Sequence, residues 1–189
     1  MIEAGATGPT GQPDRAGRAE QAEQAGPARD RRLWAELLRR TRRDQELRRR
    51  LAADAGPTPD RVLLAELAAV DDENSAWLAG VVTQRGWPGR TLVGDDGVMA
   101  AWMLAQHADT FPDRQRAFLT ALARAVAVGE ASPAQHAYLQ DRVRVNAGRP
   151  QLFGTQSTIT ADGVREPFPI EDPDGLPARR AAAGLPPLF

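Results

Sequence analysis

Gln106 and His107 are the two side chains best suited to chemistry, because they come at the end of the segment 98–109, which is apolar on every face of a helix until that turn. A helix that is apolar all round is a buried helix. Burying an amide or an imidazole without a hydrogen-bond partner costs about 1–3 kcal/mol each. The sequence therefore predicts that a polar network or a ligand satisfies both side chains and that a pocket lies beside them.

His107 is one of only two histidines in the chain. The ordinary pKa of a histidine, about 6.5, lets an imidazole carry a proton near neutral pH. We therefore interpret His107 as the catalytic acid or base. The alternative is a buried imidazole that only joins helices by hydrogen bonds. Asp109 lies on another helix face and is expected to cap the next turn.

A bound metal would need ligands from His107, His136, Asp109 and Asp141, which lack the His-x-x-x-His and His-x-x-Glu spacings of metal sites. His136 is expected to be exposed. The chain has no cysteine, and all 24 basic residues are arginine. These counts exclude cysteine nucleophiles, cysteine-ligated metals and lysine Schiff bases. We therefore expect a metal-independent reaction that uses no cofactor.

Polar side chains that interrupt apolar helix faces, or that follow the last long helix, are predicted to bind the substrate. These residues are Asp44, Gln45, Asn74, Gln106, Arg142, Gln151, Thr155 and Gln156. Amides donate and accept hydrogen bonds, and a guanidinium presents a planar fork to a carboxylate or phosphate. The alternative for the late glutamines is that they join a C-terminal ribbon to the helices. The alternative for Arg142 is an ion pair with Asp44 or Asp141.

Length and composition are those of one soluble globular domain, with 189 residues, 42% of them hydrophobic and 26% charged. No apolar run reaches the roughly 20 residues needed to cross a bilayer, and no secretory signal is recognisable. We therefore expect a cytoplasmic protein without a membrane partner. Residues 1–30 contain almost no large apolar group and are predicted to form a disordered arm before a single domain over residues 31–189.

The apolar spacing predicts a mainly α fold, a bundle of about six helices with a small C-terminal β-hairpin. The first helix is expected over about residues 31–52. Thr58 and Pro59 would open a second helix that ends near Val70, and Asp71 or Asp72 would cap a third that ends at Gly86.

Further end signals place the remaining elements. Asp95 or Asp96 would cap the buried helix, a fifth would run from about Asp113 to Val128, and the capping box at Ser132 would start a sixth. The hairpin would pair residues 151–160 with 164–170, and a short helix carrying Arg179 and Arg180 would end at Gly184.

Arginine is concentrated in the first helix, with ten arginines against four acids over residues 29–50. Such a helix could bind the phosphate backbone of a nucleic acid, but the net charge of −1 and the interspersed acids favour a solvated face. Nucleic acid is therefore the least favoured partner. Arg48, Arg179 and Arg180 are likewise interpreted as surface residues.

A string of short motifs resembles the signature of a bacterial family of unknown function over about residues 33–188. The motifs are Asp44-Gln45, Asn74, Gly86-Trp87-Pro88, Gln106-His107-Ala108-Asp109, Asp141-Arg142, Gln151-Leu-Phe-Gly-Thr-Gln156 and the segment from Arg180 to Leu185. Phe153 stands where members of that family usually have tyrosine. The resemblance implies a shared site but no particular activity.

These observations lead to one expected function and two alternatives. We expect a small enzyme of the hydrolase, lyase or cyclase type, in which His107 transfers protons to a small polar or anionic compound in a pocket closed by residues 151–156. The first alternative is a module that binds a small ligand or peptide without chemistry. The second is a nucleic-acid binder that uses the arginine-rich helix.

Overall fold

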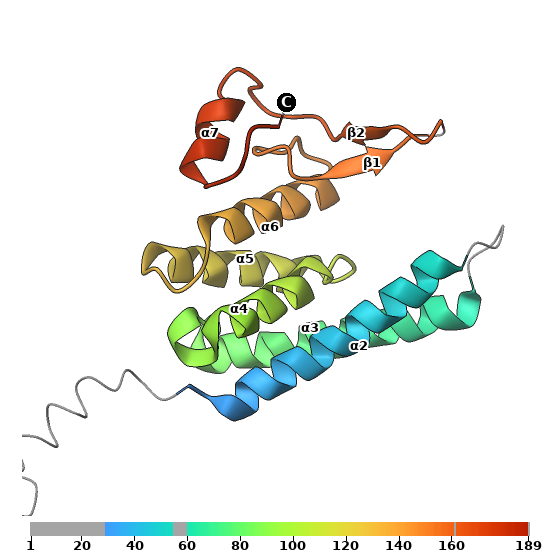
Figure 1. Ribbon diagram of the computed structural model, residues 1–189, viewed down its shortest axis with the longest axis vertical. Helices are drawn as coiled ribbons and strands as arrows, with labels where there is room; N and C mark the ends of the chain where they lie inside the picture. Colours follow the sequence, from blue (N-terminus) through green and yellow to red (C-terminus); the bar gives the residue numbers. More distant parts are fainter. Residues whose placement is uncertain (1–28, 55–59, 161, 189) are drawn as a thin grey trace, which may run out of the picture.

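The chain folds into a mainly α structure, seen in a computed structural model that describes residues 29–54, 60–160 and 162–188 (Figure 1). Within these residues there are six helices and one two-stranded antiparallel sheet near the C-terminus. The predicted fold class is thereby confirmed. Of the predicted disordered arm, residues 1–28 lie outside the described residues.

Helices α2 (Arg31–Ala53) and α3 (Arg61–Arg85) form a long antiparallel pair along one side of the molecule (Figure 1). Asp30 and Asp60 cap their N-termini by accepting hydrogen bonds from two backbone N–H groups each. The first predicted helix is confirmed. The predicted helix break at Asp71 or Asp72 is wrong, because α3 runs through both residues.

The break was predicted because an aspartate after an apolar run is typical of a helix start. In α3 these carboxylates instead bind arginines of neighbouring helices, Asp71 with Arg48 and Asp72 with Arg114. The predicted cap Thr58 lies outside the described residues. Gly86 ends α3 with a φ of 76° and a ψ of −167°, a conformation essentially restricted to glycine.

Helix α4 (Arg90–Gln106) lies at the centre of the bundle and is interrupted at Gly94, whose φ is 73°. The predicted helix start at Asp95 or Asp96 corresponds to this break, but a helical turn that begins at Arg90 precedes it. Over residues 97–105 the helix carries only apolar residues, as expected of a buried helix.

Helices α5 (Pro112–Ala127) and α6 (Pro133–Asn146) cover the other side of α4 (Figure 1). The Ser132 hydroxyl accepts from the Ala134 N–H group of α6, and Gln135 Oε1 accepts from the Ser132 N–H group. This capping box confirms the predicted helix start.

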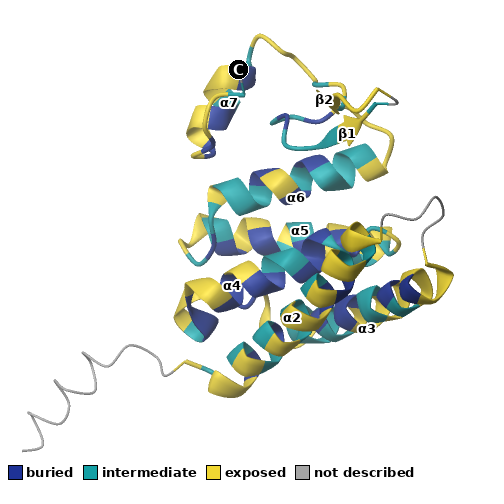
Figure 2. Cartoon of the chain, turned by 45° about the vertical axis from the view of Figure 1, so that its right-hand side comes forward, coloured by how far each residue is buried: buried dark blue, intermediate teal, exposed yellow. Residues whose placement is uncertain are grey.

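The sheet is much shorter than predicted, because β1 (Ser157–Ile159) and β2 (Arg165–Pro167) contain three residues each. Their side chains are mostly exposed, so no apolar face extends the pairing (Figure 2). Helix α7 (Leu176–Ala182) follows as predicted, and Leu185 in the tail behind it is buried.

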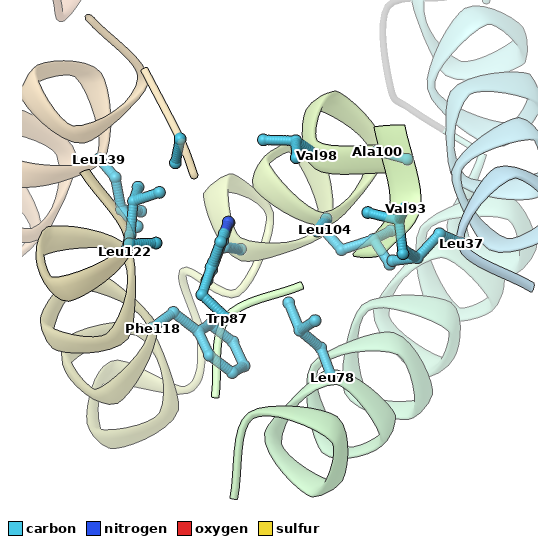
Figure 3. Close-up of a cluster of buried hydrophobic side chains, with 14 of the residues drawn as sticks. Leu37, Leu78, Trp87, Val93, Val98, Ala100, Leu104, Phe118, Leu122 and Leu139 are labelled. Atoms are coloured by element: carbon cyan, nitrogen blue, oxygen red, sulfur yellow. The ribbon is translucent and has the colours of Figure 1, made fainter. Parts of the chain in front are cut away.

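The main core lies between α4 and the helices on both of its sides (Figure 3). Leu37 and Leu78 approach α4 from one side, and Phe118 and Leu122 from the other. Three of the buried α4 residues in this core are alanines, Ala100, Ala101 and Ala105. Their small side chains let the neighbouring helices come close. The core therefore fixes the direction of the turn that follows α4.

Replacing Leu78 by alanine tests this core. Leu78 has no exposed surface, so the cavity left by Leu78→Ala should lower the free energy of unfolding by about 2–5 kcal/mol. Leu64→Ala is the matched control in the same helix, because Leu64 is 40% exposed and should lose about 1 kcal/mol or less. Urea unfolding of both variants measures the difference, and equal losses would contradict the described core.

Candidate functional site

The imidazole of His107 meets a buried carboxylate. His107 follows the last residue of α4, and its Nδ1 lies 3.0 Å from Oδ1 and 2.9 Å from Oδ2 of Asp44 on α2. The Asp44 side chain has no exposed surface, whereas 18% of the His107 side chain is exposed. A fully buried carboxylate therefore fixes one edge of a ring that is still partly open to solvent.

Two further charged residues complete this group. Arg48, one turn after Asp44, donates from Nε to Asp44 Oδ1 at 3.0 Å and from a terminal nitrogen to Asp71 Oδ1 on α3 at 2.7 Å. Gln45 donates from Nε2 to Asp44 Oδ2 at 2.9 Å. We call Asp44, Arg48, Asp71 and His107 the acid–base cluster.

The pKa values of its two carboxyl groups shift in opposite directions. Burial raises the pKa of Asp44, but the hydrogen bond and charge of His107 and the charge of Arg48 outweigh this effect and lower it. Burial also raises the pKa of Asp71, and with the negative charge of Asp44 it exceeds the lowering effect of Arg48. Asp44 therefore stays ionised, and Asp71 takes up a proton more readily than an ordinary aspartate.

The proton on His107 is assigned from the neighbours of the ring. Nδ1 faces two carboxylate oxygens, so the Nδ1–H form is favoured, since a bare nitrogen would set its lone pair against negative charge. Arg48 Nε also lies 3.1 Å from Nδ1, but it can donate to Asp44 instead. In the neutral ring Nε2 is then unprotonated, and no described residue hydrogen-bonds to it.

Helix periodicity brings these residues together, because each carboxylate occupies a position in a buried stripe. Asp44 lies between the buried Leu37 and Leu47 in α2. Asp71 follows Leu67 by four residues on the buried face of α3. Sequence reasoning missed Asp71 by assigning it to a helix cap. Its place in this stripe was the signal that could have found it.

Asp109 organises a second polar group, on the other side of α4. Arg142 of α6 donates from Nε to Asp109 Oδ1 at 2.8 Å and from a terminal nitrogen to Oδ2. Gln115 and Asn146 donate to Asp109 Oδ1 at 3.0 and 2.8 Å. Arg142 also donates to Gln156 Oε1 at 3.3 Å. We call these five residues the Asp109 cluster, and in it Asp109 takes the place of the expected Arg142 partners.

The Asp141 side chain binds the backbone of the segment 151–156. This fully buried carboxylate accepts hydrogen bonds from the N–H groups of Leu152, Phe153 and Thr155 and from the Thr155 hydroxyl, at 2.7–3.1 Å. Gln151, also fully buried, donates to the carbonyls of residues 156 and 168 and accepts from the residue 156 N–H group. Both Gln151 and Thr155 therefore make the structural hydrogen bonds that were the alternative to substrate binding.

Helix α7 holds the same segment from the opposite direction. Arg179 Nε donates to the Leu152 carbonyl at 2.9 Å, and Arg180 donates to the Phe153 carbonyl. Arg180 is only 6% exposed. The interpretation of Arg180 as a surface residue is therefore wrong. Its guanidinium is buried because its N–H groups donate to the backbone carbonyls of Phe153 and Pro186.

Gln106 and Asn74 each bury an amide nitrogen without a partner among the described residues. Gln106 follows Trp102 by one helical turn, on the face where the Trp102 indole donates to the Gln135 carbonyl of α6 at 2.8 Å. Asn74 accepts from Arg40 at 3.1 Å and leaves its Nδ2 unused. Both side chains are buried as predicted, and each retains a free donor.

The turn after α4 thus separates the predicted site residues into two groups. His107 contacts Asp44, to which Gln45 also donates, whereas Asp109 binds Arg142, which in turn donates to Gln156. No hydrogen bond within the described residues links His107 to the segment 151–156. The late glutamines therefore do not complete the surroundings of His107 by direct hydrogen bonds.

The profile of a known protein family matches residues 31–189, from the start of α2 through both clusters. The chain belongs to this family. It is DUF6624, a family of unknown function, which confirms the resemblance to such a family. Searches among curated proteins and among solved structures gave no match.

Metal binding, the environment of His136 and membrane insertion were also considered in the sequence analysis of this DUF6624 chain. In the part of the chain that the structure describes, no three His, Asp or Glu side chains are arranged to hold a metal ion. His136 is half-buried and not exposed as expected, and burial lowers its pKa. None of the described helices could span a membrane.

The arginine-rich helix α2 carries its own counter-charges. Glu36 binds Arg39 and Arg40, and Glu66 of α3 binds Arg43. These ion pairs occupy much of the basic face that a nucleic acid would contact.

The Asp109 cluster makes the stability of this DUF6624 chain depend on pH. Burial raises the pKa of Asp109, but the hydrogen bonds and charge of Arg142 outweigh it, so the folded-state pKa lies below the ordinary value. Its contribution to stability is therefore complete above the ordinary carboxyl pKa and is lost as the pH falls through the lowered one. Urea unfolding between about pH 7 and about pH 3 should show a shallower loss of stability for Asp109→Asn than for the wild type.

The control for this experiment is Asp174→Asn, which removes an exposed carboxylate. The other described carboxyl groups with lowered pKa values remain in both variants. Only the part of the pH dependence of the unfolding free energy that is assigned to Asp109 should therefore change. An Asp109→Asn slope equal to that of the wild type would contradict the assignment.

Proposed function

We propose that this chain is an acid–base enzyme in which His107 transfers a proton at Nε2. The observation that carries the proposal is the contact of both Asp44 oxygens, at 2.9 and 3.0 Å, with the Nδ1 of a partly exposed histidine. A carboxylate in this position fixes the tautomer and the orientation of the ring and leaves the other nitrogen to act as a base.

The proton steps follow from the charges of the acid–base cluster. Nε2 of His107 removes a proton from a substrate hydroxyl, amide or carbon, or from a water molecule, and returns it to the leaving group. The positive charge on the ring in between is balanced by Asp44, whose pKa is lowered by the hydrogen bond and charge of His107 and by the charge of Arg48. Arg48 also spans to Asp71 and so keeps the helices α2 and α3 in place around the ring.

The charges also favour one class of substrate. Two carboxylates and one guanidinium surround His107, so the cluster has an excess of negative charge when both acids are ionised. Such surroundings disfavour an anionic group beside the ring. We therefore propose a neutral polar compound, within the wider class of small polar or anionic molecules expected from the sequence. From the composition of the sequence we also propose a cytoplasmic location.

A binding module without chemistry is the second candidate. It is supported by the buried amide donors of Gln106 and Asn74, which have no partner among the described residues. A ligand oxygen would satisfy either group, and leaving such a donor unsatisfied is costly. In this case the same compounds would bind but would not be converted.

Replacing His107 by glutamine tests the enzyme. Glutamine can still donate to Asp44 but cannot carry a proton, so turnover should fall at least about 100-fold while the Tm changes by no more than about 5 °C. Wild type and His107→Gln are each incubated with a bacterial small-molecule extract, and the compounds consumed are identified by mass spectrometry.

His136→Gln is the matched control, because it removes the other histidine. Compounds consumed by the wild type and by His136→Gln, but not by His107→Gln, would support the proposal. Identical profiles for all three proteins would reject it, and binding without consumption would favour the second candidate.

Asp44→Asn tests the orienting role of the carboxylate. An asparagine can present its amide N–H group to Nδ1 and so favour the wrong tautomer, with the proton on Nε2. Turnover should fall on the order of 10²–10⁴-fold, and the ¹⁵N shifts of the His107 ring should report the exchange of tautomers. An unchanged ring spectrum with unchanged turnover would show that Asp44 does not orient His107.

A further inference from the structure

A cavity lies between α6, the hairpin and the C-terminal tail, far along the chain from His107. Its volume is about 350 Å³, within the usual size of sites for small molecules. Tyr138 contributes from α6, Arg165 from β2 and Arg180 from α7. The side chains lining it include no carboxylate, so the two arginines give the cavity a net positive charge.

Arg180 is a buried cation that forms no ion pair with any residue that the structure describes. Its guanidinium donates from Nε to the Pro186 carbonyl at 2.7 Å and from a terminal nitrogen to the Phe153 carbonyl. Neutral carbonyls satisfy donors but do not cancel a charge, and an uncancelled charge in a protein interior is costly. No described carboxylate lies within ion-pair distance of Arg180.

Asp141 is the carboxylate linked most directly to this region, but its oxygen atoms already accept hydrogen bonds from the segment 151–156. It accepts the Phe153 N–H group, whereas Arg180 binds the Phe153 carbonyl, so one residue stands between the two charges. Four donors of the segment 151–156 already occupy the Asp141 oxygens. Arg180 therefore makes no ion pair with Asp141, and its side chain lines the cavity.

Two further donors border the same cavity. Arg165 binds the Ser157 hydroxyl at 3.0 Å, and no described carboxylate pairs with its guanidinium. The Tyr138 hydroxyl has no hydrogen-bond partner among the described residues, and its ring is held edge-on against Trp102. A planar guanidinium fork and a phenolic hydroxyl are the donors that suit anionic oxygen atoms.

We propose that this cavity binds a small molecule through an anionic oxygen group, a carboxylate or a phosphate, with Arg180 and Arg165 as its charged ligands. The group neutralises the buried charge of Arg180, and Arg165 covers it from the exposed side of the hairpin. The site is separate from the acid–base cluster, whose excess negative charge disfavours anions. It does not depend on catalysis at His107.

Calorimetric titration of the full chain with inorganic phosphate, and separately with succinate, tests the proposal. At constant ionic strength we expect saturable binding of at least one of the two anions with one site per chain. Arg165→Gln should weaken that binding about tenfold or more, because it removes a charge-assisted hydrogen bond. Arg42→Gln is the matched control, since it removes an equal charge from an exposed position of α2.

Arg180→Lys is the second variant, because lysine keeps the charge but lacks the fork, and it should weaken binding while circular dichroism reports an intact helical content. Stronger binding of phosphate than of succinate would assign the phosphate class, and the reverse would assign the carboxylate class. Absence of saturable binding of both anions, or equal weakening by Arg42→Gln and Arg165→Gln, would overturn the proposal.

Discussion

The structure depends on how the chain satisfies charges that it places away from water. Asp44 and Asp141 are fully buried, and a buried carboxylate without partners would cost far more than any single apolar contact returns. Asp44 is satisfied by a histidine, an arginine and a glutamine, and Asp141 by three backbone N–H groups and a hydroxyl. Each carboxylate thereby determines the positions of several elements at once.

The end of α4 distributes these charged groups. His107 and Asp109 are two residues apart, and the small buried residue Ala108 between them leaves room for the chain to turn. One side chain is directed to the long pair α2 and α3, and the other to α5 and α6. The core around Leu104 therefore sets the geometry of two polar clusters that share no hydrogen bond within the described residues.

Much of the fold could be predicted from the sequence, because helix caps and apolar spacing act locally. The capping box at Ser132 and the extent of α2 are confirmed for this reason. The continuity of α3 could not be predicted, since the partners of Asp71 and Asp72 are arginines of distant helices. The same limit applies to the site. The buried polar residues were found, but their division into two clusters depends on helix packing that no local pattern contains.

The hydrogen bonds that hold the main chain of the segment 151–156 have a consequence for sequence variation. Asp141 accepts from backbone N–H groups of this segment, and Arg179 and Arg180 donate to its backbone carbonyls. Side chains of opposite charge therefore bind the same main chain. At Phe153 these bonds involve only the main chain, so the path of the segment does not depend on hydrogen bonds of the Phe153 side chain. Exchange of Phe153 for tyrosine, the residue that the resemblance implies at this position, therefore leaves the path of the segment unchanged.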